Sequence, residues 1–486
     1  MKKRIILSLA LISLALGQGN VQANADENSV RIHIDATKSA GKINRDVAGI
    51  MTDPPRPKWL QEHLVSIGMA GDKEAVAKHA GGANHFWLPV LNPSFTNLGW
   101  GGDTWILFNT WPAEGEYNWD ELDAWIDSHK RRGSKEISLV LAAVPEWLWS
   151  TEDAAEPSKV AANFFPYLKK GHVLPPSDHD KYAEMIYQTV RHLNVEKKFG
   201  VKFSVWNEPN VNFWQGTQEE LFKIAEVTTR AIKRADRHSM AGGPATAQMA
   251  PDWIEAFVKH YADNDLPLDF ISWHYYYWYA KKNGKVMNFT QQIETINQII
   301  EKYPSVGKPK LYLTEWAYDW KVSELLGPTF NGAYVAQSLY EMLEGGIAGA
   351  TYCGNLGWLD APDPAAQTFK FFNQLEDWRM QTESSDPNSG IGVIATGTQG
   401  RLALMVWNFS ETTKASSDGP RAVSINLENI GATTYRFKRY AVDPDNYQSV
   451  DPALVENRTI ESDGTLTLDF SLQPYSVCLI EITPDH

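Results

Sequence analysis

Two glutamates of this chain follow short apolar segments in the same way. Glu208 lies in the sequence VWNEPN, residues 205–210, and Glu315 lies in LYLTEW, residues 311–316. Each segment is typical of a β-strand that ends at a carboxylate beside an aromatic residue. Hydrolysis of a glycosidic bond uses a pair of carboxylic acids, one of which donates a proton to the leaving oxygen. The two motifs therefore predict a carbohydrate-cleaving site.

The elements that must position these glutamates alternate between strands and helices from about Lys42 to Phe372. Eight strands with intervening helices predict an α/β fold, a (β/α)8 TIM barrel, in which the carboxyl ends of all strands share one rim. A doubly wound open sheet is the competing arrangement, but no glycine-rich phosphate loop follows the first strand. The expected strands are Ile43–Ile50, Ala83–Leu91, Ile137–Val144, Phe203–Trp206, Met240–Gly243, Phe270–His274, Leu311–Thr314 and Gly349–Cys353, and the clearest helices are Trp119–Arg132, Asp180–Leu193, Glu219–Ala235, Phe289–Lys302 and Ala333–Leu343.

The pattern changes after about Asp386, where helical periodicity stops and short alternating segments begin. These segments predict an accessory C-terminal β-sandwich of about 100 residues. Val30–Ile34 also alternates and could complete that sandwich. The expected organisation is a signal peptide at 1–25, an N-terminal strand at 26–40, the catalytic barrel at 41–385 and the β-sandwich at 386–486. The expected strands of the sandwich are Ile391–Ile394, Leu402–Phe409, Ala422–Leu427, Tyr435–Val442, Thr465–Phe470 and Tyr475–Ile482.

The N-terminus predicts export. A positively charged start is followed by the apolar run Ile5–Leu16, which is short for a bilayer span, and by the small-residue cleavage site Ala23-Asn24-Ala25. We expect cleavage after Ala25 and a secreted or periplasmic protein; a membrane anchor is the alternative. No later segment is apolar enough to span a membrane.

The composition excludes several classes of partner and cofactor. A net charge of −14, without a basic block beyond the N-terminus, argues against a nucleic-acid partner. Cys353 and Cys478 are expected to be two separate buried thiols, and two cysteines are too few for a cysteine metal site. The 12 histidines show no local spacing typical of metal ligands. We expect no cofactor and no metal, and the oligomeric state stays open.

The motifs carry a family resemblance. WNEP at 206–209 and TEW at 314–316 resemble the paired signatures of a large clan of retaining glycosidases, which place the acid/base after strand four and the nucleophile after strand seven. Within the clan, the chain most resembles glycoside hydrolase family 39, the β-xylosidase and α-L-iduronidase family. PEWL at 145–148, FISWHYY at 270–276 and the C-terminal sandwich support this placement, which covers about residues 40–486.

The resemblance implies roles for individual residues. Glu208 would be the general acid/base and Glu315 the nucleophile. Asn207 would hydrogen-bond the 2-hydroxyl of the sugar. Either Tyr276 or Tyr275 would hold the nucleophile in place. His274 would line the same site, where a purely structural role is the alternative.

Several aromatic residues at strand ends could stack on sugar rings or could simply pack in the core. Trp147, Trp316 and Trp358 are the candidates that we assign to substrate. One departure concerns the second strand, which in the family usually ends with an arginine before a histidine. Here the sequence is ANHFW at 83–87, so that His85 remains a candidate substrate contact without an arginine beside it.

These observations predict a secreted glycoside hydrolase that cleaves a polysaccharide or oligosaccharide with retention of configuration. An endo-acting hydrolase of the same clan is the alternative within enzymes. A catalytically inactive carbohydrate-binding protein is the alternative outside enzymes, although such a protein would be expected to have lost one of the two glutamates.

Overall fold

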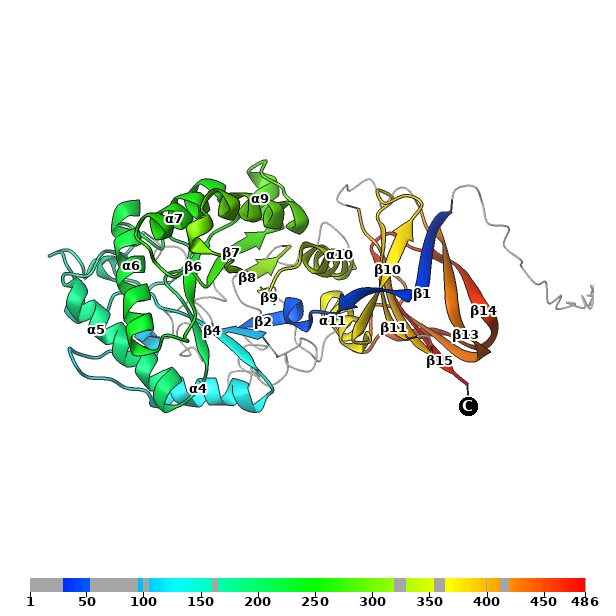
Figure 1. Ribbon diagram of the computed structural model, residues 1–486, viewed down its shortest axis with the longest axis horizontal. Coiled ribbons are helices and arrows are strands. Elements are labelled where there is room, and N and C mark those ends of the chain that lie inside the picture. Colours follow the sequence, from blue (N-terminus) through cyan, green and yellow to red (C-terminus); the bar gives the residue numbers. More distant parts are fainter. Residues whose placement is uncertain are drawn as a thin grey trace, which may run out of the picture.

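The computed structural model describes residues 29–52, 95–98, 105–159, 165–318, 329–353, 363–398, 400–410 and 419–485. Figure 1 shows a barrel with surrounding helices on one side and a β-sheet domain on the other, with α10 and α11 between them. Among the residues described, no helix is both long and apolar enough to cross a membrane.

Eight parallel strands close into a barrel in chain order, which confirms the predicted α/β barrel. Each strand pairs with the next, and β9 pairs with β2, so every strand ends at the same rim. The strands are β2 (Gly49–Thr52), β3 (Phe95–Leu98), β4 (Glu136–Val140), β5 (Val201–Ser204), β6 (Ala241–Thr246), β7 (Phe270–Tyr276), β8 (Lys310–Ala317) and β9 (Gly349–Tyr352).

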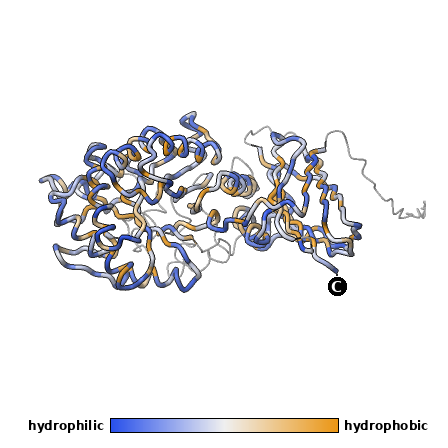
Figure 2. The backbone as a smooth tube through the Cα atoms, viewed as in Figure 1, coloured by the Kyte–Doolittle hydropathy of each residue, from blue (hydrophilic) through white to orange (hydrophobic). Residues whose placement is uncertain are grey.

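Helices follow most of these strands and pack their apolar faces on the barrel (Figure 2). Local signals fix their ends: Thr217 and Glu220 form a capping box at the start of α6, and Gly346 ends α10 in the left-handed conformation. The α-helices are α4 (Asp120–Arg131), α5 (His179–Val190), α6 (Gln218–Ala235), α7 (Pro251–Asp263), α8 (Tyr277–Lys282), α9 (Phe289–Lys302), α10 (Phe330–Gly345) and α11 (Pro364–Gln374). Short 3-10 or π segments are η1 (Arg45–Ala48), η3 (Glu146–Leu148), η4 (Lys170–Val173), η5 (Arg191–Glu196) and η6 (Pro304–Val306).

Two of the predicted barrel strands were wrong in position. The region expected to be the first strand forms η1 before β2, because the Asn44 side chain caps a tight turn by accepting from the Asp46 N–H. The second strand of the barrel is β3, which none of the expected strands includes, whereas the expected second strand, Ala83–Leu91, lies outside the described residues. Two buried polar residues, Thr96 and Asn97, make up half of β3, so its hydrophobic pattern is weak.

The second domain is one continuous sheet that curls onto itself, because β1 pairs with β10 on one side and with β13 on the other. Its strand order is β1-β10-β11-β12-β15-β13-β14. Val30–Ile34 lies in β1, so both ends of the described chain belong to this sheet. Its strands are β1 (Val30–Lys42), β10 (Trp378–Ser384), β11 (Ile391–Thr398), β12 (Arg401–Asn408), β13 (Arg421–Val442), β14 (Ala453–Leu472) and β15 (Ser476–Pro484).

Two details of this domain differ from expectation. β10 belongs to the sheet, so the barrel ends before residue 378 and not at 385. The two strands expected at 422–427 and 435–442 are one strand, β13, whose pairing with β14 shifts register between Glu428 and Ala432. Asn429, at this shift, has a φ of 59°. The break between the two expected strands is therefore a bulge within one continuous strand.

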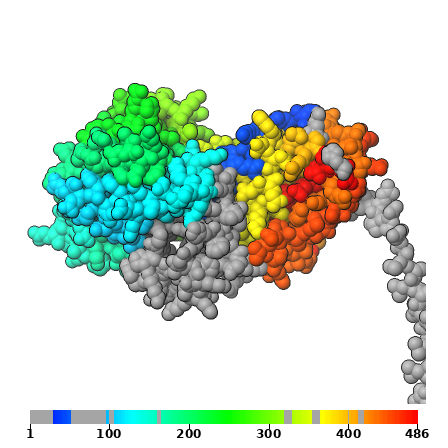
Figure 3. Space-filling view, turned by 90° about the horizontal axis from the view of Figure 1, so that it is seen from below, coloured from blue at the N-terminus to red at the C-terminus, as the bar shows by residue number. Residues whose placement is uncertain are grey.

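The two domains share a continuous apolar core. Phe330 on α10 packs on Phe409 and Tyr475 of the sheet domain, with ring centroids 5.4 and 4.9 Å apart. The indole N–H of Trp407 donates to Oε1 of Gln337 over 2.8 Å. In Figure 3 the blue N-terminal segment lies beside the yellow segment that follows the barrel, which agrees with the pairing of β1 and β10. Cys353 in the barrel and Cys478 in the sheet are not joined by a disulfide.

Candidate active site

Glu208 lies just beyond β5, at the barrel rim. Its backbone has a φ of 43°, a left-handed conformation that costs of order 1–3 kcal/mol for a residue with a side chain and that is concentrated at functional sites. A hydrogen bond from its N–H to the carbonyl of Ala245 (2.7 Å) holds this conformation. The side chain is 16% exposed, so its carboxylate is accessible but largely removed from solvent.

Glu315 lies on β8 and is 10% exposed. The register between β7 and β8 shifts by one residue, so that Glu315 pairs with His274 after Leu313 has paired with Trp273. Such a bulge re-aims a side chain at the end of a strand. The bulge brings Glu315 next to His274, whose side chain also contacts Glu208.

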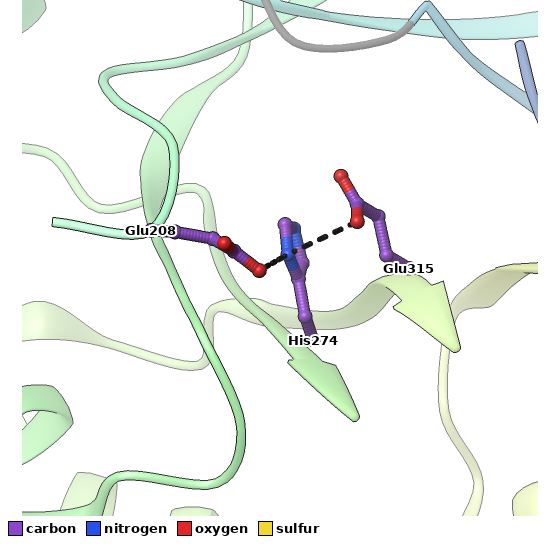
Figure 4. A group of neighbouring side chains, drawn as sticks. All are labelled: Glu208, His274 and Glu315. Carbon is purple, nitrogen blue, oxygen red and sulfur yellow. Dashed lines mark hydrogen bonds and ion pairs between the residues drawn. The ribbon is translucent and has the colours of Figure 1, made fainter. Parts of the chain in front are cut away.

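His274 on β7 lies between the two carboxylates (Figure 4). Its Nδ1 is 2.8 Å from Oε1 of Glu208 and 3.5 Å from Oε2 of Glu315. Burial lowers the pKa of His274, but the charge of Glu315 and the hydrogen bond to Glu208 outweigh burial and raise this pKa above its ordinary value of 6.5. An imidazolium here would offset the repulsion between the two carboxylates.

The ligating atoms of Glu208, His274 and Glu315 all lie within 4.8 Å of one another, so the two carboxylates are close neighbours. Carboxyl groups about 5 to 5.5 Å apart are typical of retaining glycosidases, whereas inverting enzymes leave about 6.5 to 9.5 Å. Within the described residues, this cluster also has the side chains that a metal ion would need. The sequence analysis placed all three residues at one site but did not identify them as a possible metal-binding set, because their positions along the chain, 208, 274 and 315, form no ligand motif.

Tyr276, and not Tyr275, contacts the nucleophile candidate. The Tyr276 hydroxyl donates to Oε2 of Glu315 over 2.8 Å. Burial, followed by the nearby Cys353 and the carboxylates, raises the pKa of Tyr276 well above its ordinary value, so it stays a donor at neutral pH. Tyr275 is buried and accepts from the Met287 N–H at 3.0 Å, a structural contact on the other face of β7.

Asn207, which precedes Glu208, is 3% exposed. Its Oδ1 is buried and has no hydrogen-bond partner among the described residues. A buried amide oxygen without a partner is energetically unfavourable unless a ligand satisfies it. This observation fits a contact with a substrate hydroxyl.

The tryptophan predictions had different outcomes. Trp316 as a substrate contact was wrong, because its ring is fully buried and packs on Phe289, Tyr352 and Phe369. Alternation along β8 explains the error, since Glu315 faces the barrel mouth and its neighbour must face the helices. Trp147 is partly buried and its indole N–H donates to a backbone carbonyl, so its role stays a prediction. The remaining two substrate candidates, His85 and Trp358, lie outside the described residues.

Sequence reasoning missed the side chains that hold the end of β8. The carbonyl of Thr314 accepts from Nδ2 of Asn97 on β3 at 3.0 Å and from the Thr351 hydroxyl on β9. These bonds tie the residue that precedes Glu315 to two other strands of the barrel. Single polar residues within strands carry no motif, so neither Asn97 nor Thr351 could be identified from the sequence.

Comparison with known proteins agrees with this geometry. A family model described as Glycosyl hydrolases family 39 matches residues 113–434, more than half of the 486 residues. A beta-xylosidase from Geobacillus stearothermophilus is 29% identical over 280 residues, which span 49% of this chain and 54% of that enzyme. A beta-xylosidase from Caldicellulosiruptor saccharolyticus is 24% identical over 370 residues, which span 64% of this chain and 75% of that enzyme. The chain thus spans about half the length of the first relative and three quarters of the second.

Solved structures share the fold over nearly the whole chain. A GH39 enzyme from Xanthomonas axonopodis pv. citri superimposes with a TM-score of 0.69 at 18% identity and covers 94% of this chain and 97% of its own. A monomeric beta-xylosidase from Caulobacter crescentus has a TM-score of 0.68 at 18% identity, with 94% and 100% covered. At this identity the likeness concerns the fold alone.

Proposed function

Because the chain belongs to glycosyl hydrolases family 39, a family that cleaves O-glycosidic bonds, we propose that it is a retaining β-glycosidase. The observation that carries this proposal is the proximity of Glu208 and Glu315, whose ligating oxygens lie within 4.8 Å of each other and of His274. Such proximity favours the close carboxyl pair of retaining enzymes over the wider pair, about 6.5 to 9.5 Å apart, that leaves room for a water in inverting enzymes.

In the first step, Glu315 attacks the anomeric carbon and forms a glycosyl ester, while Glu208 gives its proton to the leaving oxygen and the aglycone departs as an alcohol. Glu315 must be ionised to act, and the Tyr276 hydroxyl stabilises its charge. The same hydrogen bond fixes the carboxylate, so that its other oxygen is available for attack.

In the second step, Glu208 is a carboxylate and removes a proton from water. The water oxygen attacks the anomeric carbon, the ester bond to Glu315 breaks, and the sugar leaves with its original configuration. His274 touches both carboxylates and is suited to compensate for the negative charge that moves from one glutamate to the other during the cycle. Asn207 would bind the 2-hydroxyl of the sugar, a contact that strengthens in the transition state.

For the substrate, we propose β-xylosides from a plant polysaccharide or its oligosaccharides, since both enzymes compared by sequence are beta-xylosidases. We also propose that the protein acts outside the cytoplasm. Support for this comes from the charged start, the apolar run and the Ala23-Asn24-Ala25 site, which together have the pattern of a cleaved signal peptide.

The proposal is tested by following hydrolysis of an aryl β-D-xyloside by NMR. We expect the β-anomer of xylose to form first and then to mutarotate. Glu315→Gln should abolish turnover while the thermal unfolding of the protein remains cooperative. An α-anomer as the first product, or normal turnover by Glu315→Gln, would overturn the retaining mechanism.

Metal-assisted hydrolysis is the second candidate, because Glu208, His274 and Glu315 together resemble a metal-binding set. The two candidates differ in their response to a chelator. We expect activity to survive extended dialysis against EDTA, since the carboxylates act directly in the retaining mechanism. Activity that is lost to EDTA and restored by Zn²⁺ or Mn²⁺ would favour the metal.

A further inference from the structure

Residues 245–248 form the end of β6 and the start of the loop after it; this segment, called the β6 loop below, connects the two catalytic strand ends but contains neither glutamate. Ala245 and Gln248 both have left-handed backbones, with φ values of 52° and 63°. The register between β6 and β7 shifts between Pro244 and Thr246, so Ala245 forms a bulge. Residues with side chains rarely adopt this conformation unless surrounding contacts impose it. The loop is therefore held by its neighbours.

On one side, the loop is bonded to the segment that carries Glu208. The Glu208 N–H donates to the carbonyl of Ala245 at 2.7 Å. The side-chain amide of Asn210 makes two bonds to one backbone unit: Nδ2 donates to the carbonyl of Ala247 at 2.8 Å, and Oδ1 accepts from its N–H, also at 2.8 Å. This pairing requires a donor and an acceptor on one planar group, which only an amide side chain offers in this geometry.

On the other side, the loop is bonded to the strand that supports Glu315. In the orientation that satisfies both of its groups, the Gln248 amide accepts from the Tyr276 N–H at 3.1 Å and donates to the Tyr276 carbonyl at 3.2 Å. The Tyr276 hydroxyl in turn donates to Oε2 of Glu315. Gln248 thus fixes the backbone of the residue whose side chain holds the nucleophile.

We propose that Asn210 and Gln248 are positioning residues that set the two catalytic carboxylates relative to each other through this loop. The proposal rests on the retaining mechanism, in which Glu208 and Glu315 act on the same anomeric carbon. Both amides act through other residues: Asn210 controls the placement of the acid/base, and Gln248 controls that of the nucleophile. A displacement of about 1 Å at a reacting group can reduce a rate roughly a hundredfold.

The different roles of Asn210 and Gln248 predict different kinetic defects in their variants. Asn210→Leu and Gln248→Met keep the size of the side chain, add no charge and remove both bonds. We expect Asn210→Leu to reduce kcat/KM roughly tenfold to a hundredfold for phenyl β-D-xyloside, which needs protonation, and much less for the dinitrophenyl analogue. Gln248→Met should reduce kcat/KM for both substrates by similar factors, because every substrate needs the nucleophile.

Asn194 provides a matched control. Its Nδ2 donates to the carbonyl of Val201 at 2.8 Å and its Oδ1 accepts from the Val201 N–H at 2.7 Å, the same double contact at the far end of β5. Asn194→Leu should lower the melting temperature without changing the leaving-group dependence. Should Asn210→Leu or Gln248→Met fail to fold, Asn210→Asp and Gln248→Glu retain one of the two bonds and serve in their place.

The proposal would be overturned if the Asn210 and Gln248 variants had the same kinetics as Asn194→Leu at a similar loss of melting temperature. The two amides would then stabilise only the fold. The same defect for both leaving groups in both variants would overturn the division of roles. Failure of the proposed function is separately visible, as an inverted first product from the unmodified enzyme.

Discussion

The hydroxyl of Tyr276 lies 2.8 Å from Oε2 of Glu315 and donates a hydrogen bond to it. Tyr276 comes two residues after His274 on β7, so both side chains point to the same face of the strand. One strand thus supplies the tyrosine that contacts Glu315 and the histidine that contacts both glutamates. The proposed mechanism depends on this strand as much as on the two motifs.

We expect Tyr276→Phe to reduce kcat about tenfold to a hundredfold, because a hydrogen bond to a charged group contributes roughly 1.5–3 kcal/mol. The loss should be similar for aryl xylosides with good and poor leaving groups, since Glu208 is untouched. Steady-state kinetics with two such substrates measure it. A variant with full activity would show that the tyrosine serves only packing.

Glu208→Ala should spare substrates that need little protonation. For phenyl β-D-xyloside we expect kcat/KM to fall by roughly 10²–10⁴-fold, and for the dinitrophenyl analogue by far less. Azide should accelerate turnover of the activated substrate, because it attacks the glycosyl ester without a general base, and the product should be a β-xylosyl azide. An equal loss on both substrates, with no effect of azide, would contradict the acid/base role.

His274 should make the stability of the fold depend on pH. Its pKa is lowered by burial but raised more by Glu315 and Glu208, so the folded-state value lies above 6.5. A raised histidine pKa contributes stability that is fully present below 6.5 and is lost as the pH rises through the folded-state pKa. The difference in melting temperature between the wild type and His274→Asn should therefore shrink with rising pH across this range. A difference that is independent of pH would show that His274 carries no charge in the folded protein.

Asp363 should lower stability at neutral pH. Burial raises its pKa from 3.8 to about 6, although it accepts the Ala366 N–H as the N-cap of α11. Because the folded protein binds this proton more tightly, the penalty is absent below 3.8 and fully present above about 6. Asp363→Asn keeps the cap without the charge. We expect a gain of about 1–2 kcal/mol near pH 7, below the full linkage value because the carboxyl is partly accessible, and no gain near pH 4.

Differential scanning calorimetry at both pH values measures this effect. Asp178→Asn makes the same chemical change at the N-cap of α5, where the side chain accepts from the N–H groups of Asp180 and Lys181. An equal gain at both positions would mean that the burial of the Asp363 carboxylate is not the cause.

Trp278 should affect longer substrates more than small ones. It is 43% exposed on α8, which begins directly after Tyr276. Its backbone N–H donates to the carbonyl of Tyr318 beyond β8. Stacking of a second sugar ring on this indole would make Trp278→Ala lower kcat/KM for xylo-oligosaccharides about fivefold to tenfold more than for an aryl xyloside. Trp378, which is 55% exposed on β10 of the sheet domain, is the control. Equal effects of the two alanine variants would exclude a sugar contact at Trp278.

The amino-acid sequence by itself predicted the barrel and the two carboxylates, because both are local signals. Strands and helices alternate with clear periodicity, and a glutamate at the end of an apolar strand is visible in a single short segment. Strand numbering then placed Glu208 and Glu315 on the same rim, since all parallel strands end there. The second strand was misplaced because Thr96 and Asn97 interrupt its apolar pattern.

Only the tertiary structure decided which neighbours act on those carboxylates. A one-residue register shift at Thr314 sets Glu315 opposite His274, and such a shift has no sequence signal of its own. The choice of Tyr276 over Tyr275, the burial of Trp316 and the bonds of Asn210 and Gln248 depend likewise on which face each residue presents. These facts follow from contacts between strands far apart in the chain, whose energies are set by packing and hydrogen bonding in three dimensions and not by local preference.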